Sequence, residues 1–132
     1  MNNIKNRLKG SLYGFAIGDA MGATTEFMSE DEIKSEYGKL TDIVGGGWLD
    51  LIAGEVTDDT QMSICVMEVL MKNKNKKLST EYIYNHVWSK DDDSDTGYVW
   101  IYISYLKQKL KAINANVDIL GEENREFELV EV

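Results

Sequence analysis

The sequence predicts a mainly α-helical fold, and its tail allows a small C-terminal β-hairpin. Apolar residues recur every three or four positions in several long segments, which is the spacing of one helix face. Serine and threonine stand in front of several of these segments, where helix N-caps are found. The tail instead alternates apolar and polar residues around Phe127 and Leu129, the pattern of a strand.

The first helix is expected over residues 4–22, and its unusual feature is a glycine at every fourth position. Each glycine costs a helix about 0.5–1 kcal/mol relative to alanine, so four of them on nearly one face need compensation. We expect the close approach of a ligand or of another helix, the one predicted at 58–71, to supply it. The glycines are Gly10, Gly14, Gly18 and Gly22.

The next segments alternate between short helices and loops. Ser29 is the expected N-cap of a helix that ends near Gly38, and a glycine-rich loop follows. Helical periodicity resumes over 58–71 and ends in a lysine-rich stretch, which suits the negative end of the helix dipole. Ser79 or Thr80 is the expected cap of a helix running to about Trp88.

A polar loop, SKDDDSDTG, leads to the last expected helix, over residues 98–111. Its apolar face is wide for so short a chain, so we expect another subunit to cover part of it in a homo-oligomer. The sequence GEEN then marks the turn of the C-terminal hairpin. The residues expected on the apolar face are Val99, Tyr102, Ile103, Leu106 and Leu110.

Length and composition indicate one globular domain spanning residues 1–132. The chain is 43% apolar and 28% charged, and its net charge of −9 argues against nucleic-acid binding, which requires clustered cations. Asp19 interrupts the short apolar run near the N-terminus, so we expect neither a signal peptide nor a membrane span. The one cysteine, Cys65, is expected to be a small buried hydrophobe, compatible with a cytoplasmic protein.

The tetrapeptide Thr57-Asp58-Asp59-Thr60 admits two interpretations. Threonine is a good helix N-cap, and carboxylates in the first turn face the positive end of the helix dipole. Capping alone explains less well why a glycine-rich loop leads into this point. Crowded hard oxygen atoms are also the ligands that Mg²⁺ prefers, with water completing the shell.

Four motifs in order resemble the N-terminal part of the ADP-ribosylglycohydrolase family. They are GSLYGFAIGDAMG, then EF, then GGG, then GEVTDDTQM, and the family-like part around them covers residues of about 4–75. The resemblance implies an all-α bundle that holds Mg²⁺, or Mn²⁺ in some members, in a cleft. Here the bundle would be compact and truncated, with a divergent part at about 76–132.

The resemblance also implies roles for individual residues. Thr57, Asp58 and Asp59 would bind the metal, and Glu26 and Asp58 would take part in catalysis. The loop residues Gly45, Gly46, Gly47 and Trp48 are candidates for substrate binding, and Trp48 could flank an adenine. The only histidine, His86, fits a partly buried helix residue better than a catalytic one.

A second metal motif of this family, D-x-D-T, lies far downstream in longer members. Asp93-Ser94-Asp95-Thr96 fits that pattern and precedes an apolar helix. Either Asp93, Asp95 and Thr96 are a genuine second metal site, or an acidic loop matches a short pattern by chance. The bulky YVWIYISYL replaces the small residues that normally follow in the family.

The leading functional hypothesis is an Mg²⁺-dependent hydrolase of an ADP-ribosyl N- or O-glycosidic linkage. Its partner would be an ADP-ribose-containing small molecule or an ADP-ribosylated protein. The alternative is an inactive truncated relative that binds ADP-ribose-like nucleotides or acts as an interaction protein. A true site at Asp93, Asp95 and Thr96 near Asp58 would favour the enzyme.

Overall fold

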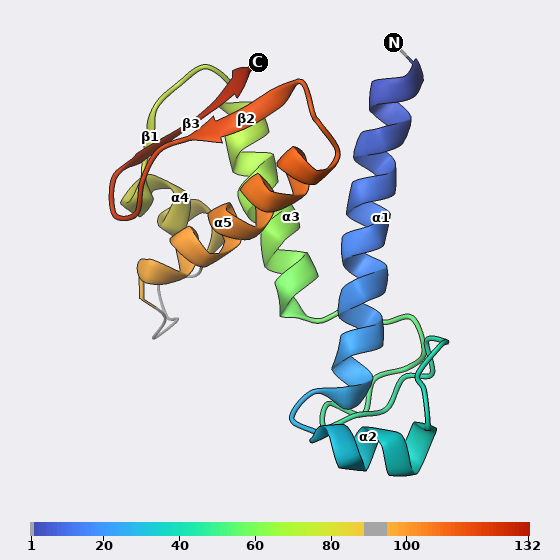
Figure 1. The fold of residues 1–132 in the computed structure, drawn as a ribbon. Coiled ribbons are helices and arrows are strands. Elements are labelled where there is room, and N and C mark those ends of the chain that lie inside the picture. The colour runs from blue at the N-terminus through green and yellow to red at the C-terminus, as the bar shows by residue number, and fades with distance from the viewer. Residues whose placement is uncertain (1, 89–94) are drawn as a thin grey trace. The chain divides into compact units, whose positions relative to one another are not determined.

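The computed structural model describes residues 2–88 and 95–132 and confirms the mainly α-helical class (Figure 1). The chain divides into two compact units. We call Leu12–Thr60 the motif unit, and Met1–Ser11 with Gln61–Val132 the core unit. The expectation of a single domain stays a prediction. Within the described ranges, no helix combines the length and apolar character needed to cross a bilayer.

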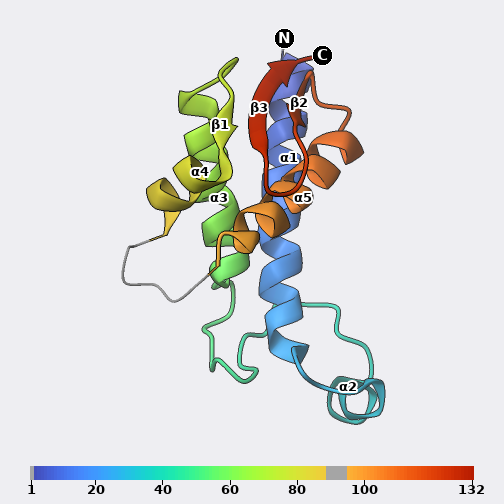
Figure 2. The same ribbon diagram turned by 90° about the vertical axis from the view of Figure 1, so that its left-hand side faces the viewer.

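The core unit contains a three-stranded antiparallel sheet with helices packed on it. Its helices are most of α3 (Asp58–Lys72), together with α4 (Thr80–Val87) and α5 (Gly97–Ala112). The strands β1 (Leu78–Ser79), β2 (Val117–Leu120) and β3 (Glu126–Glu131) have the order β1-β3-β2 (Figures 1 and 2). The predicted C-terminal hairpin is therefore confirmed as β2 and β3.

Helix α5 buries the face that its periodicity predicts. All five predicted residues are at most 5% exposed. They join one apolar cluster with residues from α3, α4 and the sheet, including Phe127, which is fully buried and pairs with Leu78 of β1. The sequence gives no alternating pattern at β1, because that strand has only two residues.

Two single-residue expectations in the core unit need correction or refinement. Cys65 is exposed, not buried, because Val66 and Leu70 define the inward face of α3 and Cys65 points elsewhere. His86 was expected to be partly buried but is an exposed residue of α4, and its ring stacks on Tyr82 with the ring centroids 4.0 Å apart. Its Nδ1 lies 2.7 Å from the Tyr82 carbonyl oxygen, so a local contact accounts for its orientation.

The motif unit contains α1 (Asn2–Thr25) from residue 12 onward, α2 (Glu30–Tyr37) and a long loop that ends at the first turn of α3. Helix α2 begins as predicted. Ser29 accepts a hydrogen bond from the Glu32 backbone, and the Glu32 carboxylate accepts one from the Ser29 backbone, which is a complete capping box. Gly38 ends the helix with a positive φ of 66°.

The close packing expected between the glycine face of α1 and the helix at 58–71 stays a prediction, because most of α3 belongs to the other unit. A Cβ added at any of its four glycines would meet no atom within 4 Å in the described part of the chain. The glycines therefore relieve no steric contact there.

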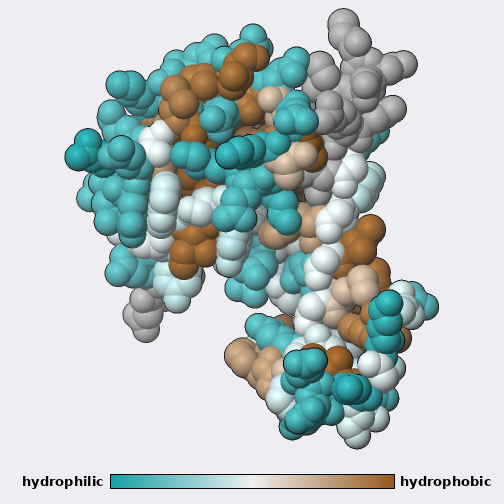
Figure 3. All heavy atoms as spheres, viewed as in Figure 1, coloured by the Kyte–Doolittle hydropathy of each residue, from teal (hydrophilic) through white to brown (hydrophobic). Residues whose placement is uncertain are grey.

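Large apolar side chains also reach the surface of the motif unit, and Figure 3 shows apolar surface in both units. Those of the motif unit are Leu12, Tyr13, Ile17, Phe27, Val44, Trp48, Leu49 and Ile52.

Candidate functional site

The Asp19 carboxylate joins α1 to the start of α3. Its Oδ2 accepts hydrogen bonds from the Thr57 backbone N–H at 2.8 Å and from the Thr60 hydroxyl at 2.6 Å. Its Oδ1 accepts a third bond, from the Thr57 hydroxyl at 2.7 Å. Asp19 and Thr57 are partly buried and Thr60 is 4% exposed, so water competes little for these bonds.

Thr57 also caps α3 as its sequence position predicts. The Thr57 hydroxyl oxygen accepts a hydrogen bond from the Asp59 backbone N–H at 3.2 Å. Asp58 and Asp59 follow in the first turn, and both side chains are exposed. Thr57, Asp58 and Asp59 are adjacent in sequence and therefore lie together at the N-terminus of α3.

The three predicted metal ligands suit a hard divalent cation, since they offer a hydroxyl and two carboxylates at a positive helix end. The Asp58 side chain makes no ion pair or hydrogen bond within the described residues, so its carboxylate oxygens are open to a ligand. No group of three Asp, Glu, His or Cys side chains positioned for a metal ion occurs in residues 2–88 and 95–132. An Mg²⁺ ion held here would therefore need water or substrate oxygens as well.

The glycine loop has a backbone that most residues could not adopt. Gly45, Gly46 and Gly47 all have positive φ, from 69° to 78°. Gly46 exchanges two backbone hydrogen bonds with Leu51, at 2.7 and 3.0 Å, which closes the loop. A Cβ on Gly47 would overlap the Ala23 carbonyl oxygen, so the loop lies directly against the C-terminal end of α1.

This close approach brings the loop to Glu26. The Trp48 indole N–H donates a hydrogen bond of 2.7 Å to Glu26 Oε2. The Trp48 ring also meets the edge of Phe27, with the ring centroids 5.5 Å apart. Trp48 is 62% and Phe27 81% exposed, so both aromatic faces remain accessible. The predicted catalytic carboxylate and the predicted substrate-binding loop are therefore neighbours.

The second predicted motif is only partly described. Asp93 lies outside the described residues, while Asp95 and Thr96 stand in front of α5 in the core unit. Asp95 Oδ1 accepts hydrogen bonds from the Gly97 backbone at 3.0 Å and from the Thr96 hydroxyl at 3.2 Å, and these lower the pKa of Asp95. The Asp95 side chain therefore binds the first backbone N–H of α5, and its role in a metal site stays a prediction.

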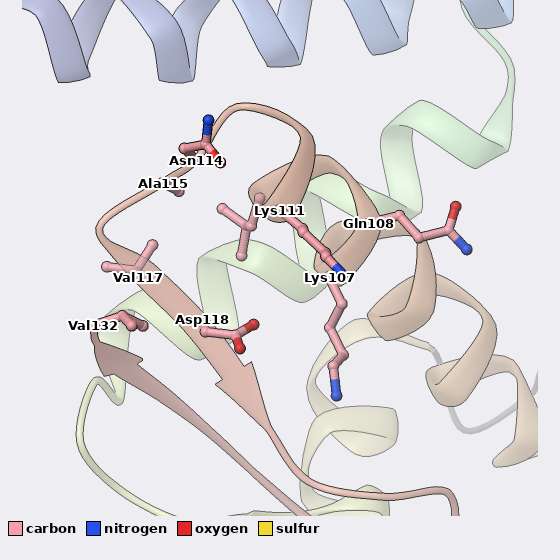
Figure 4. Close-up of a pocket in the computed structure, with 9 residues that line it drawn as sticks. Lys107, Gln108, Lys111, Asn114, Ala115, Val117, Asp118 and Val132 are labelled. Carbon is pink, nitrogen blue, oxygen red and sulfur yellow. The ribbon is translucent and has the colours of Figure 1, made fainter.

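A pocket of about 570 Å³ lies elsewhere, between α5 and β2 in the core unit (Figure 4). Lys107 and Lys111 extend from α5, and Asp118 and Val117 contribute from β2. Lys107 is engaged there, since its Nζ donates to the Gly121 carbonyl oxygen at 3.3 Å and lies 5.9 Å from the centre of the Trp100 ring. None of the predicted site residues lines this pocket.

The sequence of the chain matches a known family. The family model described as ADP-ribosylglycohydrolase matches residues 1–120. The chain belongs to the ADP-ribosylglycohydrolase family. The match extends through α5 and β2, well beyond the four motifs, so the part that we expected to be divergent is also matched as far as residue 120.

Individual relatives match about half of the chain. ADP-ribosyl-[dinitrogen reductase] glycohydrolase of Rhodospirillum rubrum is 47% identical over 64 residues, which are 48% of this chain and 22% of that protein. ADP-ribosylarginine hydrolase Tri1 of Pseudomonas putida (strain GB-1) is 49% identical over 63 residues, 48% of this chain and 16% of the relative. Tri1 of Serratia proteamaculans (strain 568) is 46% identical with the same coverage. The matched region thus spans about a fifth of the length of these relatives.

Sequence reasoning left two site residues of this ADP-ribosylglycohydrolase-family chain without a role. The sequence marks Asp19 only as the residue that interrupts the N-terminal apolar run, and Thr60 only as the end of the tetrapeptide. A carboxylate within the apolar stretch of this helix signals that polar partners come from another element. The identity of those partners, 38 and 41 residues away, follows only from the fold.

Proposed function

We propose that the chain is a metal-dependent hydrolase of the ADP-ribosylglycohydrolase type, which removes ADP-ribose from a modified side chain or a related compound. Family membership supports the reaction class, and three relatives carry names of glycohydrolases or ADP-ribosylarginine hydrolases. The observation that carries the proposal is the geometry of the motif unit. There an oxygen-rich helix start and a carboxylate flanked by exposed aromatic rings occur in one compact unit.

The metal ligands would be Thr57, Asp58 and Asp59, with Mg²⁺ as the expected ion and Mn²⁺ as a substitute. When bound, such an ion acts as a Lewis acid that polarises a coordinated water or substrate oxygen. The chain's own contribution is to hold the hydroxyl and carboxylate oxygens at one helix end, where the helix itself is positive. Asp95 and Thr96, with Asp93, are proposed as the ligands of a second ion.

Glu26 would act as the proton acceptor. Hydrolysis forms a bond between a water oxygen and the anomeric carbon of ribose and breaks the bond from that carbon to the modified group. The water loses a proton to a base, and the departing nitrogen or oxygen gains one. Trp48 holds Oε2 of Glu26, which leaves Oε1 for the water. Gly45, Gly46, Gly47 and Trp48 would contact the substrate, with the exposed indole face flanking a base or sugar.

Asp58→Asn tests the metal site. It keeps the side-chain shape and removes one charge, so millimolar Mg²⁺ should raise the Tm of the wild type but not of the variant. If capping is the sole role of Asp58, the variant should instead lose a little stability equally with Mg²⁺ and with EDTA. Asp31→Asn, an exposed first-turn carboxylate of α2, is the matched control and should keep the full Mg²⁺ shift.

Glu26→Gln tests catalysis separately from metal binding. Its Mg²⁺ shift in Tm should equal that of the wild type, while release of ADP-ribose from an ADP-ribosylated arginine substrate should fall by about 10²–10⁴-fold, the contribution of a positioned base. Full activity of Glu26→Gln would exclude it as the base. A wild type that binds ADP-ribose and Mg²⁺ without hydrolysis would support the alternative, a binding protein derived from an enzyme.

The predicted homo-oligomer stays a prediction. Helix α5 exposes an apolar stripe beside its buried face, formed by Tyr98 at 46%, Ile101 at 43% and Tyr105 at 37%. Such stripes are typical of faces that associate. Sedimentation velocity should show a dimer or larger species that Ile101→Lys dissociates. A monomer at high micromolar concentration would contradict the prediction.

A further inference from the structure

We propose that Asp19 is a positioning residue that directs the Thr57 hydroxyl so that its oxygen can bind the cation. This inference rests on the metal site proposed above and assigns a role to a residue outside the ligand set. Asp19 lies in α1, within one compact unit with Thr57 and Thr60, so the contacts concerned are all internal to the motif unit.

The proton of the Thr57 hydroxyl has a defined acceptor. A hydroxyl has one proton to donate and two lone pairs that can accept. Thr57 donates its proton to Asp19 Oδ1 at 2.7 Å. One lone pair accepts the Asp59 backbone N–H at 3.2 Å. The second lone pair has no partner among the described residues, so it is available to a cation.

Without Asp19 the Thr57 hydroxyl proton would have no fixed acceptor, and it could point toward the cation. A cation repels a proton that points toward it, so a threonine ligand must direct its O–H elsewhere. Asp19 provides the acceptor that fixes this direction, as carboxylates do for ligands in other metal sites. The negative charge of the acceptor also makes the Thr57 oxygen a better donor to a cation.

Asp19 is a supporting residue and not a further ligand, because its own oxygens are occupied. A carboxylate has about four lone-pair positions, and hydrogen bonds take three of those on Asp19. The bond from the Thr57 backbone N–H to Oδ2 fixes the orientation of the carboxylate, and the Thr60 hydroxyl adds a second bond to the same oxygen. Oδ1 is thereby held where the Thr57 hydroxyl needs an acceptor.

A pair of substitutions on the two ends of this network separates positioning from stability. Asp19→Asn retains the size of the side chain but allows its amide to donate to the Thr57 oxygen, which would occupy a lone pair and release the hydroxyl proton. Thr60→Val removes only the bond to Oδ2 from the buried neighbour and leaves the Thr57–Asp19 bond. Both changes should lower the Tm in EDTA.

The readout is the Mg²⁺ concentration that produces half of the maximal Tm shift in the full chain. Asp19→Asn should raise it by about 10–100-fold, the range seen when a supporting partner of a ligand is lost. Thr60→Val should leave it close to the wild-type value despite the lower Tm. If Asp19→Asn does not fold, Asp19→Glu keeps both acceptors but moves them by one methylene, so it should also raise the half-maximal concentration while Thr60→Val does not.

Two results would overturn the inference, and they differ in what else they overturn. If the wild type responds to Mg²⁺ and Asp19→Asn, or Asp19→Glu in its place, responds at the same concentration, Asp19 serves the fold alone and the metal proposal survives. If Thr60→Val raises the half-maximal Mg²⁺ concentration as much as Asp19→Asn does, the same conclusion follows. If the wild type shows no Mg²⁺ shift, both the metal site and the role of Asp19 fail together.

Discussion

The two units of this chain are stabilised by different interactions. The core unit has a continuous cluster of buried apolar side chains contributed by α3, α4, α5 and the sheet. In the motif unit the described buried apolar side chains are Ala20 and Ala23, while eight larger ones are exposed. There the backbone is held instead by the Asp19 hydrogen bonds, the capping box of α2 and the closed glycine loop.

The core unit therefore supplies most of the buried apolar side chains, while the motif unit carries most of the candidate site residues. The hydrophobic effect is non-directional, so the core unit can tolerate many apolar substitutions of similar volume. Hydrogen bonds and positive-φ glycines are directional, and each fixes one backbone segment in one place. In the motif unit these directional contacts hold the oxygens in place and leave the aromatic rings accessible, and the unit has no large apolar core of its own.

The largest expected difference between the units comes from one substitution made in each. Phe127→Ala removes a fully buried ring and should lower the free energy of unfolding by about 3–5 kcal/mol. Phe27→Ala removes an 81% exposed ring of the motif unit and should cost less than about 1 kcal/mol. Urea unfolding of both variants measures the contrast. Similar losses would mean that Phe27 is covered in solution, by a ligand or by another chain.

Much of the core unit could be predicted because its signals are periodic. The five buried residues of α5 and the buried Phe127 and Leu129 of β3 follow from spacing alone. The pairing of β1 with β3 could not be predicted, since a two-residue strand has no period and Leu78 pairs with Phe127 across a long stretch of sequence. Cys65 was placed wrongly because an apolar run in a helix contains inward and outward residues alike.

The site divides in the same way between local and non-local features. Thr57 as a cap, the acidic first turn of α3 and the sharply turning glycine loop are local and were predicted. The Asp19–Thr57 and Glu26–Trp48 hydrogen bonds join residues 38 and 22 positions apart, and no sequence pattern specifies them. The glycine face of α1 shows the limit of composition, because small residues permit close packing without specifying the partner.

Two glycine substitutions sharpen the comparison within the motif unit. Gly47→Ala places a Cβ on the Ala23 carbonyl oxygen at a φ of +69° and should destabilise the unit by about 1–3 kcal/mol. Gly14→Ala meets nothing within 4 Å in the middle of α1 and should stabilise it by about 0.5–1 kcal/mol. Thermal unfolding monitored by circular dichroism measures both. A destabilised Gly14→Ala would show that a partner packs on the glycine face in solution.

The smallest expected effect concerns two carboxylates whose pKa is lowered for different reasons. In the motif unit, Ser29 donates two hydrogen bonds to Glu32, and both lower the pKa of Glu32 from 4.5. The bond from the Ser29 hydroxyl has the larger effect and the bond from its backbone N–H the smaller. In the core unit, a hydrogen bond and the positive charge of Lys74 lower the pKa of Glu131. A lowered pKa in the folded state means stability that is complete above the ordinary value and is lost as the pH falls through the folded value.

Ser29→Ala should therefore raise the pKa of Glu32 toward 4.5, because the stronger of the two hydrogen bonds is removed, and leave that of Glu131 unchanged. Raising the salt concentration should instead raise the pKa of Glu131 more than that of Glu32. Screening weakens the attraction of Lys74 for Glu131 more than it weakens a hydrogen bond within a capping box. Carboxylate chemical shifts followed by NMR between pH 2 and 7 report both groups in one sample. If salt raised the pKa of Glu32 as much as that of Glu131, long-range charge and not the capping box would hold Glu32 ionised, and the polar contacts of the motif unit would be weaker than its geometry indicates.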